Sequence, residues 1–277
     1  MSLAGKIAFV TGGARGQGRC HALALAEAGA DVAVCDLGSD LASVKYPLAT
    51  PEEIDETVRL IEKFGRRGLG FVADVRDRAA VQGAVDSTIA EFGQIDILCA
   101  NAGIFSRGGI PELSEDSWQT MLDVNLTGVF NAMRAVIPGM VARGSGRIIA
   151  TSSMAGNVGA PYMSHYAAAK WGVIGLVKSA ALEVATTGVT VNAICPTNVN
   201  TAMLHNDDMY SFFAPGIDSP TADQAMTAFA ARIPMGVPWV EPSDVSDAVL
   251  FLAGDAARFI SGETIAVAAG SIARTAS

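Results

Sequence analysis

The feature that most constrains the fold is the alternation of short apolar runs, rich in β-branched residues, with longer segments of helical periodicity. Strands that alternate with helices in this way form a parallel sheet with both faces covered, and right-handed crossovers wind that sheet doubly. Because no repeat or linker divides the chain, we predict one α/β domain of Rossmann-like type over residues 1–277. The expected strands cover residues 6–11, 31–36, 70–73, 95–100, 147–151, 190–195 and 264–267.

The turn after the first expected strand is rich in glycine, with the sequence TGGARGQG at residues 11–18. Gly12, Gly16 and Gly18 allow a tight turn, a close approach of the backbone to a pyrophosphate, and close packing of the next helix on the sheet. The N-terminus of that helix then faces the negative charge. An ordinary turn can also be rich in glycine, but the position between a strand and a helix favours a dinucleotide site.

An acidic residue stands at the end of the second expected strand. Asp36 lies 18 residues after Gly18, close to the spacing of about 20 that suits an acid bonded to a ribose 2′-hydroxyl. A carboxylate there repels a 2′-phosphate, so the sequence predicts NAD rather than NADP unless Arg15 offsets the acid. The alternative is a solvated acid at a strand end.

Three candidate catalytic side chains lie near the carboxyl edge of the expected sheet. Tyr166 and Lys170 are four residues apart in an expected helix at 162–184, so their side chains share one face. Ser153 lies just past the strand at 147–151 and reaches the same edge. A helical face without any catalytic function can carry the same Tyr–Lys pair.

Further motifs follow the expected strands in order, and the whole series resembles the short-chain dehydrogenase/reductase family. The resemblance implies a Rossmann-like domain, usually a homotetramer, that transfers hydride between NAD(P) and an alcohol or carbonyl compound. It also implies that Lys170 bonds the nicotinamide ribose and that Asn125 positions a water that relays the proton. The motifs are the glycine turn, Asp74-Val75, Asn101-Ala102-Gly103, Asn125 in an expected helix at 117–141, Ser153, Tyr166 with Lys170, and Pro196 followed by Thr201.

The residues that we expect to form the site fall into two groups. The catalytic group is Asn125, Ser153, Tyr166 and Lys170. The contacts with NAD are expected from Gly12, Arg15, Gly16, Gln17, Gly18, Asp36, Leu37, Asp74, Val75, Asn101, Ala102, Gly103, Pro196, Val199 and Thr201, together with Tyr166 and Lys170.

The chemistry of alcohol oxidation suits the catalytic group. A base must take the hydroxyl proton while hydride leaves, and lowering the pKa of a tyrosine from about 10 toward 7 needs about 4 kcal/mol in favour of the phenolate. The ammonium of Lys170 and an oxidised nicotinamide ring can supply that energy, so we expect a lowered pKa for Tyr166. Ser153 would hold the substrate oxygen. The competing hypothesis is a catalytically silent dinucleotide-binding sensor or scaffold.

The chain departs from the family pattern at two places. Pro196 is followed by Thr197 where the family usually has glycine, and the connection at 37–50 is longer than usual, ending where Thr50 and Pro51 begin a helix. Both features resemble carveol-dehydrogenase-like enzymes, a group associated with the redox cofactor mycofactocin. We therefore expect the insertion to cover NAD, which is then retained during turnover and reoxidised by an external acceptor of the mycofactocin kind. The alternatives are a plain surface loop or a subunit contact.

The segment at 200–236 follows the sixth expected strand and is rich in methionine and phenylalanine. We expect it to be a lid over a small apolar alcohol or ketone, terpenoid-like by the resemblance, although packing between subunits is an alternative. Phe105, Met154, Tyr162 and His165 are candidates to line the pocket as well. The lid candidates are Met203, Leu204, Met209, Phe212, Phe213, Met226 and Phe229.

Composition excludes several other classes of function. With a formal charge of −9 and no basic stripe, the chain is not expected to bind nucleic acid or an anionic membrane surface. No run of residues suits a membrane span or a secretory signal, so we expect a cytoplasmic protein without a metal site. Only 17% of residues are charged, which favours an oligomer.

Overall fold

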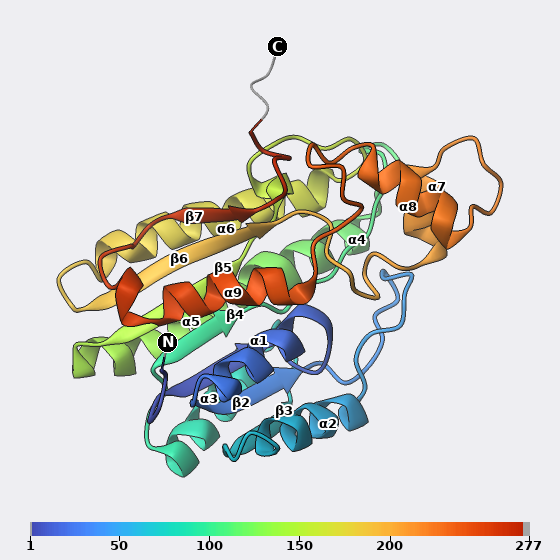
Figure 1. The fold of residues 1–277 in the computed structure, drawn as a ribbon. Helices are drawn as coiled ribbons and strands as arrows, with labels where there is room; N and C mark the ends of the chain where they lie inside the picture. Colours follow the sequence, from blue (N-terminus) through green and yellow to red (C-terminus); the bar gives the residue numbers. More distant parts are fainter. Residues whose placement is uncertain (1, 274–277) are drawn as a thin grey trace.

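The computed structural model describes residues 2–273 and contains one seven-stranded sheet, in which neighbouring strands all run parallel (Figure 1). Their order is β3-β2-β1-β4-β5-β6-β7, so the order reverses between β1 and β4. This is the doubly wound, Rossmann-like sheet that the sequence predicts. The strands are β1 (Ile7–Thr11), β2 (Asp31–Asp36), β3 (Gly68–Val72), β4 (Ile97–Ala100), β5 (Gly146–Thr151), β6 (Val189–Pro196) and β7 (Thr264–Val267).

Helices cover both faces of the sheet, and the side chains of each strand alternate between two apolar cores. Phe9 of β1 packs in the core under α3, α5 and α6, whereas Ala8 and Val10 pack in the core under α1, α2 and α9. Figure 1 shows α1 and α9 side by side on the near face. The helices are α1 (Gly16–Glu27), α2 (Pro51–Glu62), α3 (Arg78–Phe92), α4 (Glu115–Leu122), α5 (Gly128–Arg143), α6 (Ser164–Glu183) and α9 (Pro242–Ala253).

Two segments extend past the carboxyl edge of the sheet, where ligands bind in this kind of fold. The first is the insertion at 37–50, and the second is the lid at 200–236 with helices α7 (Asp207–Phe213) and α8 (Ala222–Ala230). The two segments lie near each other at the right of Figure 1. They are joined by a third, smaller apolar cluster, formed by Tyr46, Phe105, Leu204, Met209, Ala225 and Phe229.

The prediction of one long helix at 117–141 is wrong in one respect. The structure divides it into α4, a π-helical turn (Asp123–Thr127) and α5. Apolar periodicity continues through the turn, so the pattern gives no sign of the wider turn. By contrast, α2 begins at Pro51 as predicted, with the backbone N–H of Thr50 donating to Glu53 Oε2 at 3.0 Å.

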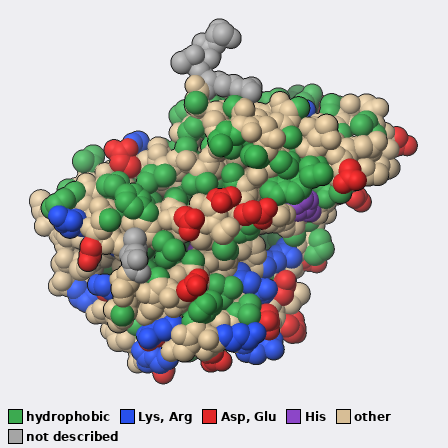
Figure 2. Space-filling view, in the orientation of Figure 1, with side chains coloured by type: hydrophobic (Ala, Val, Ile, Leu, Met, Phe, Trp, Pro, Cys, Tyr) green, Lys and Arg blue, Asp and Glu red, His purple; other side chains and the backbone are tan. Residues whose placement is uncertain are grey.

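Charges of both signs are interleaved on the lower part of the surface in Figure 2, and apolar side chains are more frequent above it. Within residues 2–273, no helix is both long and apolar enough to cross a bilayer. The same residues contain no cluster of three or more His, Cys, Asp or Glu side chains that could hold a metal ion.

Candidate active site

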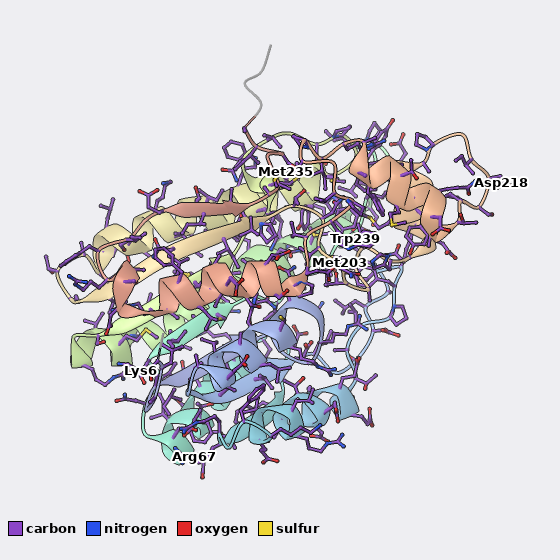
Figure 3. All side chains as sticks on the ribbon, viewed as in Figure 1. Lys6, Arg67, Met203, Asp218, Met235 and Trp239 are labelled. Atoms are coloured by element: carbon purple, nitrogen blue, oxygen red, sulfur yellow. The ribbon has the colours of Figure 1, made fainter. Side chains whose placement is uncertain are left out.

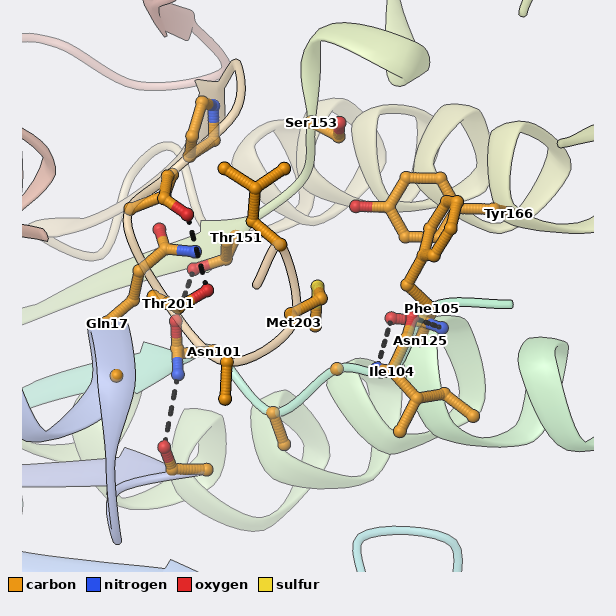
Figure 4. A pocket seen from close by; sticks show the side chains of 18 of the residues that line it. Gln17, Asn101, Ile104, Phe105, Asn125, Thr151, Ser153, Tyr166, Thr201 and Met203 are labelled. Carbon is orange, nitrogen blue, oxygen red and sulfur yellow. Dashed lines mark hydrogen bonds between the residues drawn. The ribbon is translucent and has the colours of Figure 1, made fainter. Parts of the chain in front are cut away.

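A cavity of about 730 Å³ opens at the carboxyl edge of the sheet. Its walls come from the glycine turn, the insertion, the ends of the central strands, the first turns of α6 and the lid. Figure 4 shows side chains from several of these walls, among them Gln17, Ser153 and Met203. Every residue that the sequence predicts for catalysis or for contact with NAD lines this cavity. They are Gly12, Arg15, Gly16, Gln17, Gly18, Asp36, Leu37, Asp74, Val75, Asn101, Ala102, Gly103, Asn125, Ser153, Tyr166, Lys170, Pro196, Val199 and Thr201.

The glycine turn leaves no room for side chains. Gly12 has a φ of 66°, and a Cβ there would lie 2.7 Å from the Cα of Ala102. A Cβ on Gly18 would collide with the carbonyl oxygen of Gly12. The turn is also tied to β4, because the side-chain amide of Asn101 donates to the Thr11 and Gly12 carbonyls at 3.2 and 3.3 Å. The bare backbone at the start of α1 can therefore approach a phosphate closely.

Asp36 ends β2 with its carboxylate held by the backbone. Oδ2 accepts from the N–H of Ala14 at 3.0 Å, and Oδ1 accepts from the N–H of Leu37 at 2.8 Å. Burial raises the pKa of Asp36, and these two hydrogen bonds oppose the rise. Each carboxylate oxygen keeps a further lone pair for a ribose hydroxyl, so the site fits an adenosine ribose.

Two other polar side chains bear on the fit of a dinucleotide. The Oε1 atom of Gln17 is buried beside the cavity and has no hydrogen-bond partner among residues 2–273. A ligand that donates a hydrogen bond there would satisfy it. Asp74 is already engaged, since Arg76 Nη2 donates to its Oδ2 at 2.6 Å. Although burial raises the pKa of Asp74, the bonds from Arg76 hold it below its usual value.

The insertion at 37–50 forms part of the cavity wall. Leu41, Leu48 and Ala49 line the cavity beside Asp36, and the guanidinium of Arg15 donates to the carbonyl of Pro47. The insertion therefore runs along the end of the cavity that fits adenosine. It does not project into solvent as a plain surface loop would.

The three candidate catalytic side chains meet at the other end. Ser153 caps a 3₁₀ turn (Met154–Gly156), where its Oγ accepts from the N–H of Ala155 at 3.1 Å. Figure 4 shows the Tyr166 hydroxyl directed toward Ser153. Lys170 is only 3% exposed, and its Nζ donates to the Thr151 carbonyl at 2.8 Å.

Burial dominates the titration of this pair. It raises the pKa of Tyr166 against the opposing effect of the Ser153 hydroxyl, and it lowers the pKa of Lys170 to about 8. The expected lowering of the Tyr166 pKa, which also requires the positive ring of an oxidised nicotinamide, therefore stays a prediction for the complex with NAD. The Lys170 ammonium is directed to a backbone carbonyl and lies 5.8 Å from the centre of the Tyr166 ring.

Asn125 lies in the π-helical turn and is fully buried. Its Oδ1 accepts from the N–H of Ile104 at 3.2 Å, and its Nδ2 donates to the Ile104 carbonyl at 3.0 Å (Figure 4). The wider turn thus aims this amide at the loop after β4. Gly103 allows the contact, because a Cβ there would lie 2.7 Å from Asn125 Oδ1.

The unusual Thr197 is one of the residues that line the cavity. Its N–H donates to the Val267 carbonyl at 3.1 Å, and its hydroxyl lies 3.3 Å from Ser271 Oγ and 3.4 Å from Met154 Sδ. The side chain therefore forms local polar contacts near the end of β7.

The lid supplies an apolar wall, although two of its expected members do not line the cavity. Met226 is 38% exposed, and Phe229 is buried beneath Phe213 with ring centres 4.7 Å apart. Figure 3 shows Met203 on the inner side of the lid and Asp218 at its far tip. The lid candidates that line the cavity are Met203, Leu204, Met209, Phe212 and Phe213.

Of the other pocket candidates, Phe105 and Met154 line the cavity, and two do not. Tyr162 is 60% exposed, and His165 is buried with its Nε2 2.9 Å from Ser106 Oγ. Tyr46, which reaches the cavity from the insertion, is not among the residues predicted from the sequence. Neither periodicity nor a motif marks this residue, and only its place in the insertion could have suggested it.

Comparisons with known proteins agree with this geometry. The family model described as short chain dehydrogenase matches residues 6–209. The sequence is 44% identical to (-)-trans-carveol dehydrogenase of Rhodococcus erythropolis, over 96% of this chain and 97% of that protein. Carveol dehydrogenase from Mycobacterium avium, solved in complex with NAD, has a TM-score of 0.96 and 40% identity over 98% of this chain and 99% of its own. A short chain dehydrogenase from Mycobacterium paratuberculosis bound to NAD has a TM-score of 0.90 and 34% identity, over 99% and 100% of the two chains.

Proposed function

This chain belongs to the short-chain dehydrogenase/reductase family, and we propose that it transfers hydride between tightly held NAD and a small apolar secondary alcohol or its ketone. It is an oxidoreductase that acts on CH–OH groups with NAD as its cofactor. One observation carries the finer proposal: Ser153, Tyr166 and Lys170 line the same cavity as Asp36 and the glycine turn.

The residues around the cavity suit NAD. The glycine turn would hold the pyrophosphate, Asp36 the adenosine ribose, and Lys170 the nicotinamide ribose. A carboxylate at 36 repels a 2′-phosphate, which favours NAD over NADP. When bound, NAD accepts the hydride from the carbinol carbon or returns it to the ketone.

In the proposed mechanism, the protein's side chains hold the substrate and move its proton. Ser153 Oγ bonds the substrate oxygen and fixes the carbinol carbon. Tyr166 Oη takes the hydroxyl proton, and positive charge beside the ring must offset the rise in its pKa that burial causes. Lys170, with a pKa of about 8, can accept and release a proton near neutral pH. Asn125 would position the water through which the proton reaches solvent.

The substrate class follows from the wall that the lid contributes to the cavity. Met203, Met209 and Phe213 offer apolar and adaptable surfaces, which suit a compact hydrocarbon skeleton with a single hydroxyl. The relative named carveol dehydrogenase acts on such a compound, so we propose a terpenoid alcohol of the carveol kind.

The insertion supports the proposal that NAD stays bound during turnover. Because its residues wall the end of the cavity next to Asp36, the insertion must open before the nucleotide can leave. The bound NADH would then be reoxidised by an external acceptor of the mycofactocin kind. We also propose that the protein works as a homotetramer.

The test begins with pure protein that has never been given a nucleotide. Heat denaturation should release about one NAD per chain, identified by mass spectrometry and absorbance. Adding carveol should produce absorbance at 340 nm without added NAD, and a dye acceptor should allow repeated turnover. Protein that arrives without nucleotide and rapidly reduces added NAD would contradict tight retention.

Tyr166→Phe provides the first mutational prediction. The variant keeps the ring but has no proton to exchange, so the rate of bound NAD reduction should fall by at least about 1,000-fold while the NAD content stays unchanged. An active Tyr166→Phe enzyme would refute the mechanism. Wild-type protein that retains NAD but turns over no alcohol would instead be a dinucleotide-binding scaffold.

A further inference from the structure

Three consecutive residues of the insertion are tied to three different parts of the molecule. Lys45 Nζ lies 2.9 Å from Asp208 Oδ1 on the lid helix α7. The Tyr46 hydroxyl accepts a hydrogen bond at 3.0 Å from the backbone N–H of Phe105, in the loop after β4. The Pro47 carbonyl accepts from Arg15 of the glycine turn. Residues 45–47, which we call the strap, therefore link the lid, the loop after β4 (the β4 loop) and the glycine turn.

Tyr46 is held in place by apolar packing and by one hydrogen bond. It is 7% exposed and packs in the cluster that contains Leu204, Met209 and Phe229. Its hydroxyl is the acceptor for the amide of Phe105, a residue that is also 7% exposed. A buried N–H without an acceptor is costly, so this hydroxyl holds the backbone at Phe105 in place.

Phe105 in turn contacts the proposed catalytic tyrosine. The centres of the Phe105 and Tyr166 rings are 5.2 Å apart at an angle of 74°, which is an edge-to-face contact. Figure 4 shows the Phe105 ring against Tyr166, with the Tyr166 hydroxyl pointing away from it toward Ser153. Phe105 therefore limits how far the Tyr166 ring can swing away from Ser153. Proton transfer is sensitive to displacements of about 1 Å.

We propose that Tyr46 is a positioning residue for Tyr166, acting through Phe105. Its hydrogen bond to the Phe105 amide keeps the Phe105 ring against Tyr166, and so the placement of the strap determines how well Tyr166 is aligned with Ser153. The proposal rests on the proposed function and deepens it, because it assigns the insertion a part in proton transfer besides covering the cofactor.

The test compares Tyr46→Phe with wild type in the NAD-loaded, full-length protein. The phenylalanine keeps the buried ring and removes only the acceptor of the Phe105 amide. Stopped-flow absorbance at 340 nm measures the reduction of bound NAD by the fastest alcohol in a panel containing carveol and cyclohexanol. The limiting rate should fall at least tenfold, while the alcohol concentration at half-saturation changes less than threefold. An effect confined to thermal stability would overturn the proposal.

Tyr210→Phe is the matched control. Tyr210 packs against the same aromatic cluster, and its hydroxyl bonds His205 Nδ1 at 3.0 Å, so this change also removes one tyrosine hydroxyl. Tyr210 does not contact Phe105 or Tyr166 through any aromatic pair or hydrogen bond within residues 2–273. The control should therefore keep its limiting rate within twofold of wild type, and an equal loss in both variants would count against the proposal.

A double-mutant cycle tests the route through Phe105. Phe105→Leu alone should lower the limiting rate about as much as Tyr46→Phe, and the double variant should be no slower than the slower single variant. Losses that multiply would mean that Tyr46 acts by another route. If Tyr46→Phe does not fold, Phe105→Leu still decides the matter, because a normal rate in that variant removes the link to Tyr166.

Two outcomes separate this inference from the proposed function. If Tyr166→Phe stays active, or if no alcohol in the panel reduces bound NAD, the proposed function fails. A crystal structure of Tyr46→Phe then still tests the inference, since rings that remain 5.2 Å apart with an unmoved Phe105 backbone would refute the positioning role. If Tyr166→Phe is inactive and Tyr46→Phe is fully active, only the inference fails.

Discussion

At the scale of single residues, burial acts on the proposed catalytic pair in opposite directions. It disfavours the charged form of each side chain, raising the pKa of Tyr166 and lowering that of Lys170 to about 8. The residue types and their spacing could be predicted from the sequence. The direction of the Tyr166 pKa shift could not, because it depends on how deeply the folded chain buries the phenol.

Lys170→Met provides a prediction on stability. In nucleotide-free wild type, the folded state binds fewer protons than the unfolded state between the folded pKa of about 8 and the usual 10.5. Wild-type stability relative to the variant should therefore rise with pH across this window, by about 1 kcal/mol between pH 8 and 9. Urea unfolding at pH 7, 8 and 9 measures the difference. Parallel curves for the two proteins would show that Lys170 titrates normally.

By the same reasoning, the burial of His21 should make the stability of the fold sensitive to acid. It is fully buried between α1 and α9, with Nδ1 2.8 Å from Ser246 Oγ, and burial lowers its pKa to about 3. Below pH 6.5 the unfolded chain gains a proton that the folded chain does not bind. Wild type should therefore lose about 2 kcal/mol between pH 6.5 and 5 that His21→Gln retains. Equal losses in the two proteins, measured by urea unfolding, would contradict this assignment.

At the scale of elements, the insertion and the lid are joined by an ion pair between side chains that are far apart in sequence. The carboxylate of Asp208 in α7 accepts a hydrogen bond from Lys45 of the insertion. It also accepts from two nitrogens of Arg107 in the β4 loop, at 2.9 and 3.2 Å. Lys45 and Asp208 are separated by 163 positions. The sequence could predict both segments from their length and composition, but no local pattern predicts a contact over that distance.

Asp208→Asn should loosen this junction. Losing both ion pairs removes about 1 to 2 kcal/mol of contact between the lid and its neighbours, so NADH should dissociate about tenfold faster. Fluorescence of released NADH measures the rate. Asp218→Asn is the matched control, because Asp218 lies at the exposed tip of the lid in Figure 3 and forms no ion pair within residues 2–273. Equal release rates in the two variants would show that the junction does not limit dissociation.

At the scale of the whole molecule, the alternation of strands and helices was sufficient to predict the sheet. It also predicts one edge for the ends of all strands, and the cavity lies there, lined by all the expected site residues. Which residues of the lid face the cavity and which face away from it could not be predicted from the sequence. Met226 and Phe229 are of the same residue types as Met203 and Phe213, and only the folded arrangement of the lid decides which of them line the cavity.

The assembly also leads to a prediction. Several large apolar side chains are exposed on the single chain, among them Phe130, Trp171, Leu182 and Phe259. Exposed apolar surface on this scale favours burial between subunits. Sedimentation equilibrium at micromolar concentration should give four times the chain mass of 28.5 kDa. A mass of one chain under these conditions would exclude the homotetramer.

The π-helical turn between α4 and α5 restricts which changes of sequence this protein can accept. Deleting one residue at 123–127 to make the helix regular would rotate every later position of α5 by about 100° relative to α4. Met133 and Val136, now in the core, would then face elsewhere, and the Asn125 amide would miss the Ile104 backbone. Each residue of this turn can be replaced by a single substitution. A change in the length of the turn, however, requires that the whole of α5 be redesigned with it.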